Sequence, residues 1–124
     1  MTYIDGFVIP VPQEQRQAYL DMATMAAPIF KEHGALQVVE CWGDDLPHGH
    51  TTDFFRATQA VEGENVVFSW IVWPSKDARD AGNAKVMADP RLEMHNQTMP
   101  FDGKRMFMGG FTLLLDTQTE EQQA

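Results

Sequence analysis

The chain has 124 residues, of which 44% are hydrophobic, so it has the usual size of one domain and enough apolar side chains for a packed core. Its 9 basic and 18 acidic residues give a formal net charge of −9, which argues against nucleic-acid and membrane-surface partners because both are anionic. Cys41 is the only cysteine, so we expect no internal disulfide. No apolar run approaches the roughly 18 residues of a membrane span, and the N-terminus lacks a signal-peptide pattern. We therefore expect a cytoplasmic protein.

The N-terminal part of the chain predicts a strand followed by a long helix. Residues 3–11 alternate weakly between two faces, as strands do. The two prolines within residues 10–12 are expected to end this strand and open a helix. Residues 13–33 then carry apolar side chains at helical spacing, with Pro28 expected to kink the helix before it resumes. Gly34 is the expected left-handed cap.

The middle of the chain predicts two further strands. Residues 36–42 alternate again, and residues 43–50 read as a polar, turn-rich loop. Residues 51–60 are expected to be extended, with the Phe54-Phe55 pair reaching the core. Residues 66–73 are apolar on both alternating faces and rich in β-branched and aromatic side chains, which predicts a central strand that is covered on both sides.

A second helix is predicted after this central strand. Ser75 is a favourable N-cap, and the helix is expected to run to about Ala88. Gly82 should weaken it by about 1 kcal/mol relative to alanine. A short helical turn is expected near residues 91–94. The side chains that we expect the helix to bury are Ala78, Ala81, Ala84, Val86 and Met87.

The last strand is predicted over residues 106–115, where Gly109-Gly110 indicates a bulge or a close backbone approach. The order strand, helix, strand, strand, helix, strand is the α+β, ferredoxin-like βαββαβ pattern with a four-stranded antiparallel sheet. Residues 1–116 should form this single domain, and residues 117–124 a polar C-terminal tail.

Both helices must cover the same face of the sheet, yet its other face is also apolar. We therefore expect a second copy of the chain to cover that face in a two-fold symmetric homodimer. Trp70 lies in the middle of the central strand, so Trp70→Ala is expected to cost about 3–5 kcal/mol through loss of core packing.

Five short blocks of the sequence carry a resemblance to a known family. They cover residues 31–35, 43–45, 68–72, 99–106 and 109–111. In these blocks the chain resembles the YbaA-like family, a group of small bacterial proteins built on a domain of unknown function. The resemblance extends over nearly the whole chain and implies the dimeric α/β-barrel version of the ferredoxin-like fold. It implies no established activity.

Two weak signals for metal or nucleophile chemistry lie near the second predicted strand. His48 and His50 resemble half a metal site, to which nearby aspartates could contribute, but two loop histidines are more often solvated. Cys41 could act as a nucleophile, although a lone cysteine in a strand is more often a small buried hydrophobe. We predict neither a resident metal nor a cofactor.

Two strand carboxylates are stronger candidates. Asp5 and Glu40 could form a pair within the barrel in which one pKa is raised for proton transfer. A salt bridge across a dimer, to Arg56 or Arg105, explains them equally well.

The remaining candidates are aromatic or near the C-terminus. Trp42 and Trp70 could line a ligand pocket, although ordinary core burial is the commoner role of tryptophan. Asp102 and Arg105 could bind an anionic ligand group or form only a local ion pair.

Two classes of function remain open at this level. One is a protein that binds or transforms a small molecule, in a pocket between the sheet and its helices or inside the dimer barrel. The other is a non-enzymatic structural or protein-interaction module. A metabolite that raises the melting temperature would favour the first class, because a ligand of the native state must stabilise it.

Overall fold

The computed structural model describes residues 1–93 and 99–119 of the chain. Its strands are β1 Tyr3–Pro12, β2 Gln37–Trp42, β3 Glu64–Trp73 and β4 Phe107–Thr112. Its α-helices are α1 Arg16–Glu32, α2 Phe54–Ala57, α3 Lys76–Met87 and α4 Pro90–Glu93. Single-turn 3-10 helices lie at Gln13–Gln15 and Thr117–Thr119.

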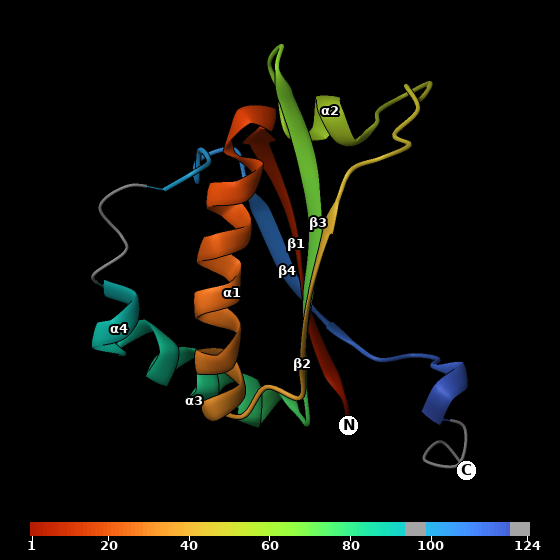
Figure 1. Ribbon diagram of the computed structural model, residues 1–124. Helices are drawn as coiled ribbons and strands as arrows, with labels where there is room; N and C mark the ends of the chain where they lie inside the picture. Colours follow the sequence, from red (N-terminus) through yellow and green to blue (C-terminus); the bar gives the residue numbers. More distant parts are fainter. Residues whose placement is uncertain (94–98, 120–124) are drawn as a thin grey trace.

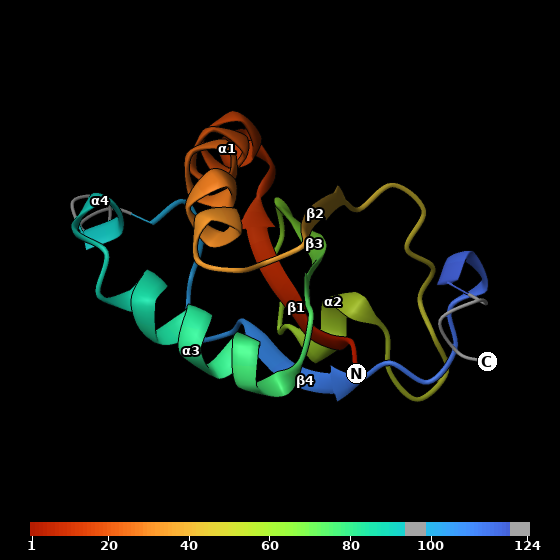
Figure 2. The same ribbon diagram turned by 90° about the horizontal axis from the view of Figure 1, so that it is seen from below.

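The four strands form one antiparallel sheet in the order β2-β3-β1-β4. The two long helices α1 and α3 lie on the same side of it, and the opposite side, which we call the open face, carries only the short helix α2 among the described α-helices (Figures 1 and 2). This confirms the predicted α+β, ferredoxin-like fold. Among the described residues, no helix is both long and apolar enough to cross a membrane.

The register of the central strands separates the two faces of the sheet. Ile9 pairs with Val67, and both are buried against Tyr19 and Ala23 of α1. Trp73 at the end of β3 is fully buried on the same face. The hydrophobic core therefore lies between the sheet and its helices.

The first helix agrees well with its prediction. It continues through Pro28 to Glu32, so the proline does not end it. Gly34 has a φ of 114°, as expected for a left-handed cap. Its backbone N–H donates to the carbonyl of Lys31, and the N–H of Ala35 donates to that of Phe30. These two bonds are those of a Schellman motif, which satisfies the last carbonyls of the helix.

The expected extended segment over residues 51–60 is wrong. Asp53 instead caps the short helix α2, because its side chain accepts a hydrogen bond from the backbone N–H of Arg56 at 2.8 Å. Phe54 is exposed and packs edge-on against Phe68, and Phe55 is half-buried. Neither phenylalanine belongs to the core, since α2 lies on the side of the sheet away from α1 (Figures 1 and 2).

The second long helix begins where predicted but turns a different face inward. Ser75 caps it by accepting a hydrogen bond from the N–H of Ala78 at 3.0 Å. Gly82 and Val86 are its buried residues. The expected burial of three other side chains is wrong, since each is exposed: Ala81, Ala84 and Met87.

Gly82 is required by packing. A Cβ at this position would overlap the indole of Trp73 and would lie 2.7 Å from the carbonyl oxygen of His33. The absence of a side chain lets α3 approach both the sheet and the end of α1.

The last strand is shorter than predicted. β4 pairs with β1 without a bulge between residues 107 and 112, and the close contacts at Gly110 are with side chains rather than with another backbone segment. A Cβ at Gly110 would overlap the hydroxyl of Tyr3 and lie 2.8 Å from Nη2 of Arg79. Of the predicted polar tail, residues 120–124 lie outside the described residues, as does Met94 of the predicted turn at residues 91–94.

The open face of the sheet carries large apolar side chains. Phe68, Phe107 and Phe111 are 46%, 45% and 60% exposed. Trp70 also lies on this face, opposite Gly6 of β1, and is half-buried. Within one chain the central strand is therefore covered on one side only, and in a single copy Trp70→Ala would cost less than the loss of a fully buried tryptophan.

Candidate functional site

A cavity of about 210 Å³ lies between α1 and the helix-covered face of the sheet, which we call the inner cavity. Its walls are formed mainly by apolar side chains from α1, the strands and the segment before β4. They include Phe7, Ile9, Met22, Ala26, Ala27, Phe30, Val38, Ile71, Phe101 and Met106. The polar side chains on its wall are Tyr19, Glu40 and Ser69.

These three polar residues are brought together by α1 and two neighbouring strands. Glu40 of β2 pairs with Ser69 of β3, so both side chains point toward α1. The hydroxyl of Tyr19 donates a hydrogen bond to Oε1 of Glu40 at 2.7 Å. Tyr19 and Ser69 are buried, whereas Glu40, on the edge strand, reaches the surface.

The surroundings shift both ionisable groups. Partial removal of the Glu40 carboxylate from water raises its pKa, against the opposing effect of hydrogen bonds from Tyr19 and Ser69. Burial, and then the negative charge of Glu40, raise the pKa of Tyr19 far above its usual value. Tyr19 therefore stays a hydrogen-bond donor, and Glu40 is the group that can accept a proton.

Tyr19 and Glu40 also border a second hollow of about 250 Å³ on the outer side of α1 and β2, which we call the outer hollow. Arg16 and Trp42 line it, and the guanidinium of Arg16 lies 5.6 Å from the centre of the Trp42 ring. Tyr19 and Glu40 line both the inner cavity and the outer hollow, so the hydrogen bond between these two residues lies at the boundary of the two spaces.

Asp102 and Arg105 support the inner cavity without lining it. Nη1 and Nη2 of Arg105 each donate to the carboxylate of Glu64 at 2.7 Å, and Nε donates to Asp102 at 2.9 Å. The segment that they fix carries Phe101, whose ring packs edge-on against Tyr19 with the centroids 5.9 Å apart. The sequence left two roles open for Asp102 and Arg105, binding an anionic ligand group or forming a local ion pair. The ion pair is present, and it anchors one wall of the cavity.

Asp5 is fully buried and occupies a different part of the helix-covered face. Its carboxylate accepts hydrogen bonds from Nε1 of Trp73 and Nε of Arg79, both at 3.0 Å, and from Nδ2 of Asn83 at 3.5 Å. Asp5 and Glu40 thus have separate partners and do not form the predicted carboxylate pair. The cluster around Asp5 binds α3 to the sheet.

The other alternative for the two carboxylates was a salt bridge to Arg56 or Arg105, and within the chain neither forms. Arg56 instead lies against Asp53, with Nε 3.1 Å from the carboxylate, and Arg105 is engaged by Glu64. Arg56 therefore holds the histidine loop, and Arg105 holds the segment before β4 against Glu64 at the start of β3.

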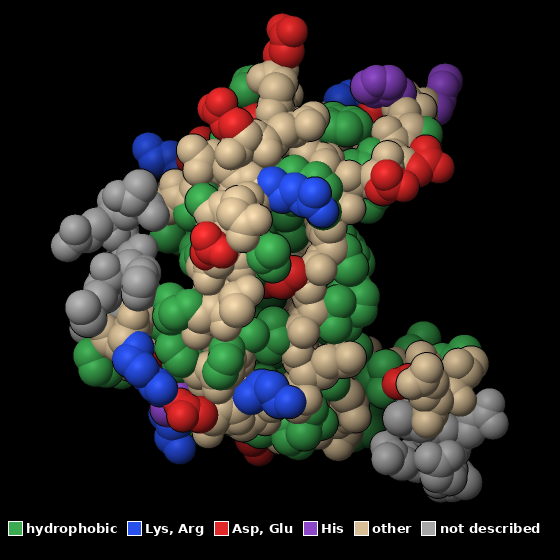
Figure 3. Space-filling model, viewed as in Figure 1, with side chains coloured by type: hydrophobic (Ala, Val, Ile, Leu, Met, Phe, Trp, Pro, Cys, Tyr) green, Lys and Arg blue, Asp and Glu red, His purple; other side chains and the backbone are tan. Residues whose placement is uncertain are grey.

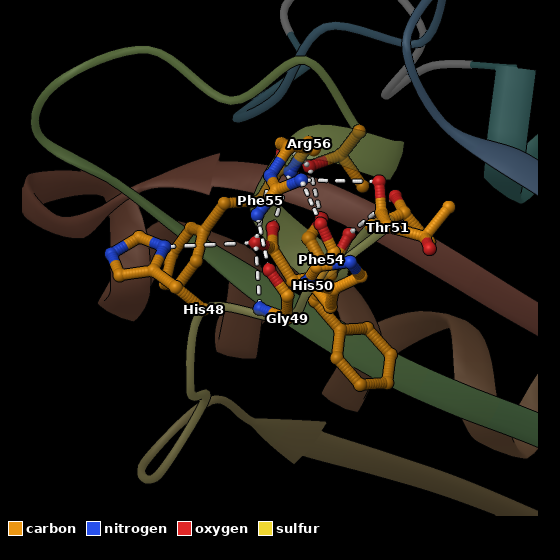
Figure 4. A network of polar contacts seen from close by, with 10 residues as sticks. His48, Gly49, His50, Thr51, Phe54, Phe55 and Arg56 are labelled. Atoms are coloured by element: carbon orange, nitrogen blue, oxygen red, sulfur yellow. Dashed lines mark hydrogen bonds and ion pairs between the residues drawn. The ribbon is translucent and has the colours of Figure 1, made fainter.

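The histidine loop is organised by helix capping (Figure 4). Asp53 accepts hydrogen bonds from the backbone N–H groups of Arg56 and Gly49, and Nδ1 of His48 lies 3.6 Å away from it. His50 is exposed. Among the described residues, no group of three or more His, Cys, Asp or Glu side chains is arranged to hold a metal ion.

The remaining candidates lie apart from one another. Trp42 borders the outer hollow, whereas Trp70 packs at a tilt of 60° against Phe68 of the open face, with the ring centroids 5.7 Å apart. Cys41 is exposed on β2 opposite Phe68, so the expectation of a buried hydrophobe is wrong.

The open face forms a second apolar surface with a groove of about 470 Å³. Its wall contains Trp70, Phe107 and Phe111 and has almost no polar area. In Figure 3 hydrophobic side chains follow the edge of the body that faces the C-terminal segment. In the described part of the chain, an apolar hollow thus lies on each face of the sheet, and of these two the inner cavity has ionisable side chains, Tyr19 and Glu40, on its wall.

Comparison with known proteins identifies close relatives of the sequence. A family model described as "Protein of unknown function (DUF1428)" matches residues 2–103. The chain is 56% identical over 116 residues to the uncharacterized protein YbaA of Escherichia coli (strain K12), covering 94% of this chain and 99% of YbaA. The uncharacterized YbaA protein of Shigella flexneri matches to the same extent.

Solved structures share the fold at low sequence identity. Rv0793 from Mycobacterium tuberculosis aligns with a TM-score of 0.53 and 13% identity, over 94% of this chain and 99% of that one. A nipsnap family protein with unknown function from Agrobacterium tumefaciens aligns with a TM-score of 0.56 and 16% identity, over 89% and 86% of the two chains. At these identities the similarity supports the fold alone.

Proposed function

The chain belongs to the DUF1428 family, whose members include YbaA, and we propose that it binds a small molecule in the inner cavity as one subunit of a homodimer. The proposal of small-molecule binding rests on the position of Glu40. A carboxylate with a raised pKa borders an otherwise apolar cavity and is held there by Tyr19. Pockets that combine apolar walls with a few placed polar groups are the usual form of small-molecule sites.

Glu40 also gives the site a chemical capacity. Its carboxylate can accept a proton from a bound molecule, because partial desolvation raises its pKa toward the range in which general bases work. Tyr19 keeps its proton and can hold the carboxylate in place throughout. This arrangement favours a binding or proton-transfer role over a purely structural one.

A cavity-filling variant tests binding. Ala26 lies on the wall of the inner cavity, so Ala26→Leu should occupy part of the space while keeping the helix intact. We expect a small neutral organic compound to raise the melting temperature of the unaltered protein and to have a much smaller effect on Ala26→Leu. Ala18→Leu is the matched control, since Ala18 is an exposed alanine of the same helix outside this cavity.

Two results would count against this function. One is that no compound small enough for the cavity stabilises the unaltered protein. The other is that a stabilising compound acts equally on Ala26→Leu and Ala18→Leu, which would place it elsewhere.

The second part of the proposal concerns the open face. Three phenylalanines and Trp70 lie there within one chain, and leaving each large apolar side chain in water is disfavoured by roughly 1.5–3 kcal/mol relative to burial. A second copy offers the same apolar surface, so a two-fold interface would be self-complementary. The segment after β4 extends away from the body on this side, with Leu114 96% exposed (Figure 1). Self-association through this face therefore accompanies the binding function and does not compete for the inner cavity.

A further inference from the structure

We propose that the inner cavity takes a small neutral molecule with an apolar body and a single hydroxyl group, and that this hydroxyl donates a hydrogen bond to Glu40. The inference rests on the proposed binding function and specifies its ligand class. Three properties of the cavity lead to it: its volume, the few polar side chains on its wall, and the hydrogen-bonding state of those side chains.

The volume limits the size of the ligand. A cavity of about 210 Å³ equals roughly seven times the 30 Å³ that one water molecule occupies in the liquid. A compact molecule with roughly seven non-hydrogen atoms, such as a six-membered ring with one substituent, matches this space. Larger ligands would extend out of the cavity into solvent, since the cavity is open on one side.

The hydrogen bonds inside the cavity determine which polar group the ligand must carry. The hydroxyl proton of Tyr19 is donated to Oε1 of Glu40, and Ser69 also donates to this carboxylate. A carboxylate has about four lone-pair sites and only accepts hydrogen bonds when it is ionised. Glu40 therefore retains capacity to accept one more bond, and a group that donates is what it can bind.

Charged ligands fit this wall poorly. A carboxylate ligand would be repelled by Glu40, and no Lys or Arg is among the described residues of the wall to offset the repulsion. An ammonium group would have to give up most of its hydration to enter a cavity whose described wall is apolar apart from Glu40 and two hydroxyls. Removing a charge from water costs more than removing a neutral hydroxyl, which favours the alcohol. One hydroxyl makes the single bond that the cavity offers.

A series built on one ring tests this assignment. Cyclohexanol, methylcyclohexane, cyclohexylamine and cyclohexanecarboxylate share a six-membered ring and differ in the attached group. Their affinities can be measured by titration calorimetry or ligand-observed NMR near pH 8. We expect cyclohexanol to bind about tenfold or more tightly than methylcyclohexane, since a hydrogen bond to a charged group contributes that much. The amine and the carboxylate should bind more weakly than the alcohol.

Two variants separate the hydroxyl contact from the cavity itself. Glu40→Leu removes the acceptor and should abolish the preference for the alcohol over the hydrocarbon, while the hydrocarbon still binds. Gln37→Leu is the matched control, because Gln37 lies on the same strand but on its opposite face, and it should keep the preference.

The outcomes distinguish this inference from the binding function. If neither the hydrocarbon nor the alcohol binds the unaltered protein, the proposed cavity function fails together with the inference. If both bind equally, if Glu40→Leu keeps the preference, or if the amine or the carboxylate binds most tightly, the binding function stands and the hydroxyl assignment is overturned.

Discussion

Glu40 is the residue on which the chemistry of the inner cavity depends. It lies on an edge strand, faces α1, and is bonded to Tyr19. Its raised pKa means that the folded chain binds the proton more tightly than the unfolded chain. Between the ordinary pKa of 4.5 and the raised value, the folded state therefore carries more protons, and the free energy of unfolding falls as the pH increases through that window.

Glu40→Gln should remove this loss of stability. The amide keeps an acceptor for the Tyr19 hydroxyl and cannot ionise. We expect the variant to melt at a higher temperature than the unaltered protein at about pH 8, and the difference to shrink as the pH falls below the ordinary pKa of 4.5, where Glu40 becomes protonated in both states. Differential scanning calorimetry across this range is the measurement, with Glu62→Gln as the control at an exposed glutamate. A Glu40→Gln protein that is less stable at pH 8 would show that the carboxylate is not destabilised by its surroundings.

Gly82 provides a second test at the scale of one residue. Alanine should improve the helix by about 1 kcal/mol, but its Cβ would overlap the Trp73 indole. Overpacking of this kind usually costs more, so we expect Gly82→Ala to lower the free energy of unfolding by about 1–3 kcal/mol in urea denaturation. Gly103→Ala is the control, since nothing lies within 4 Å of the added carbon there. Equal stability of the two variants would contradict the close packing of α3 on Trp73.

At the scale of elements, α3 explains why the sequence predicted its limits but not its inner face. The N-cap Ser75 is a local signal and was sufficient to place the start of the helix. Arg79, Gly82, Asn83 and Val86 follow helical spacing, but two of them are polar, so an apolar pattern does not reveal them. They face inward because Asp5, more than 70 positions earlier in the chain, is buried beneath them and requires their hydrogen bonds. Such a long-range requirement cannot be read from local periodicity.

The segment before β4 shows the same limit for the site. Asp102 and Arg105 stood out in the sequence as a charged pair, but their effect on the cavity depends on Glu64 and on the contact of Phe101 with Tyr19. Tyr19 lies within residues 13–33, whose apolar side chains at helical spacing predicted a helix, and nothing in that pattern marks it as a site residue. The sequence signal that could have identified Tyr19 as a site residue is its hydroxyl group on the buried face of the helix, because a buried hydroxyl needs a hydrogen-bond partner.

Arg105→Gln tests whether this segment holds the cavity wall. The substitution removes the two bonds to Glu64 and the bond to Asp102. We expect cyclohexanol to bind several-fold more weakly, because Phe101 and Met106 would lose their fixed positions. Lys104→Gln removes the same charge from the adjacent residue, whose side chain makes no hydrogen bond or ion pair within the described part of the chain, and should leave binding unchanged. Equal affinities for the two variants would mean that the ion pairs do not position the wall.

At the scale of the whole molecule, the two faces of the sheet have different roles in the proposed account. The order of strands and helices and the apolar character of both faces were predictable, because they follow from periodicity along the chain. The assignment of Asp5 and Glu40 to the helix-covered face, rather than to a dimer interface, depended on the register of β1 and β2 against β3. The open face is thereby free of these charges, which favours its burial against a second copy.

Phe111→Asp tests that interface. Phe111 is 60% exposed on the open face, so a charge there should not disturb the core of one chain but should prevent face-to-face packing. We expect light scattering at micromolar concentration to give twice the mass of one chain for the unaltered protein and one chain for the variant. The interface should bury at least about 800 Å² per subunit. Met87→Asp, at an exposed methionine of α3, should remain dimeric. A monomeric unaltered protein would refute the dimer.

The central claim, that a small hydroxylated molecule occupies the inner cavity, is tested most directly by methyl NMR of the protein labelled at its methionines. Met22 and Met106 lie on the cavity wall, whereas Met87 is 79% exposed on α3. Titration with cyclohexanol should shift the methyl resonances of Met22 and Met106 to a common saturation point and leave that of Met87 unchanged. Saturable binding that leaves Met22 and Met106 unmoved, or shifts that grow linearly and equally at all three methionines, would contradict the account.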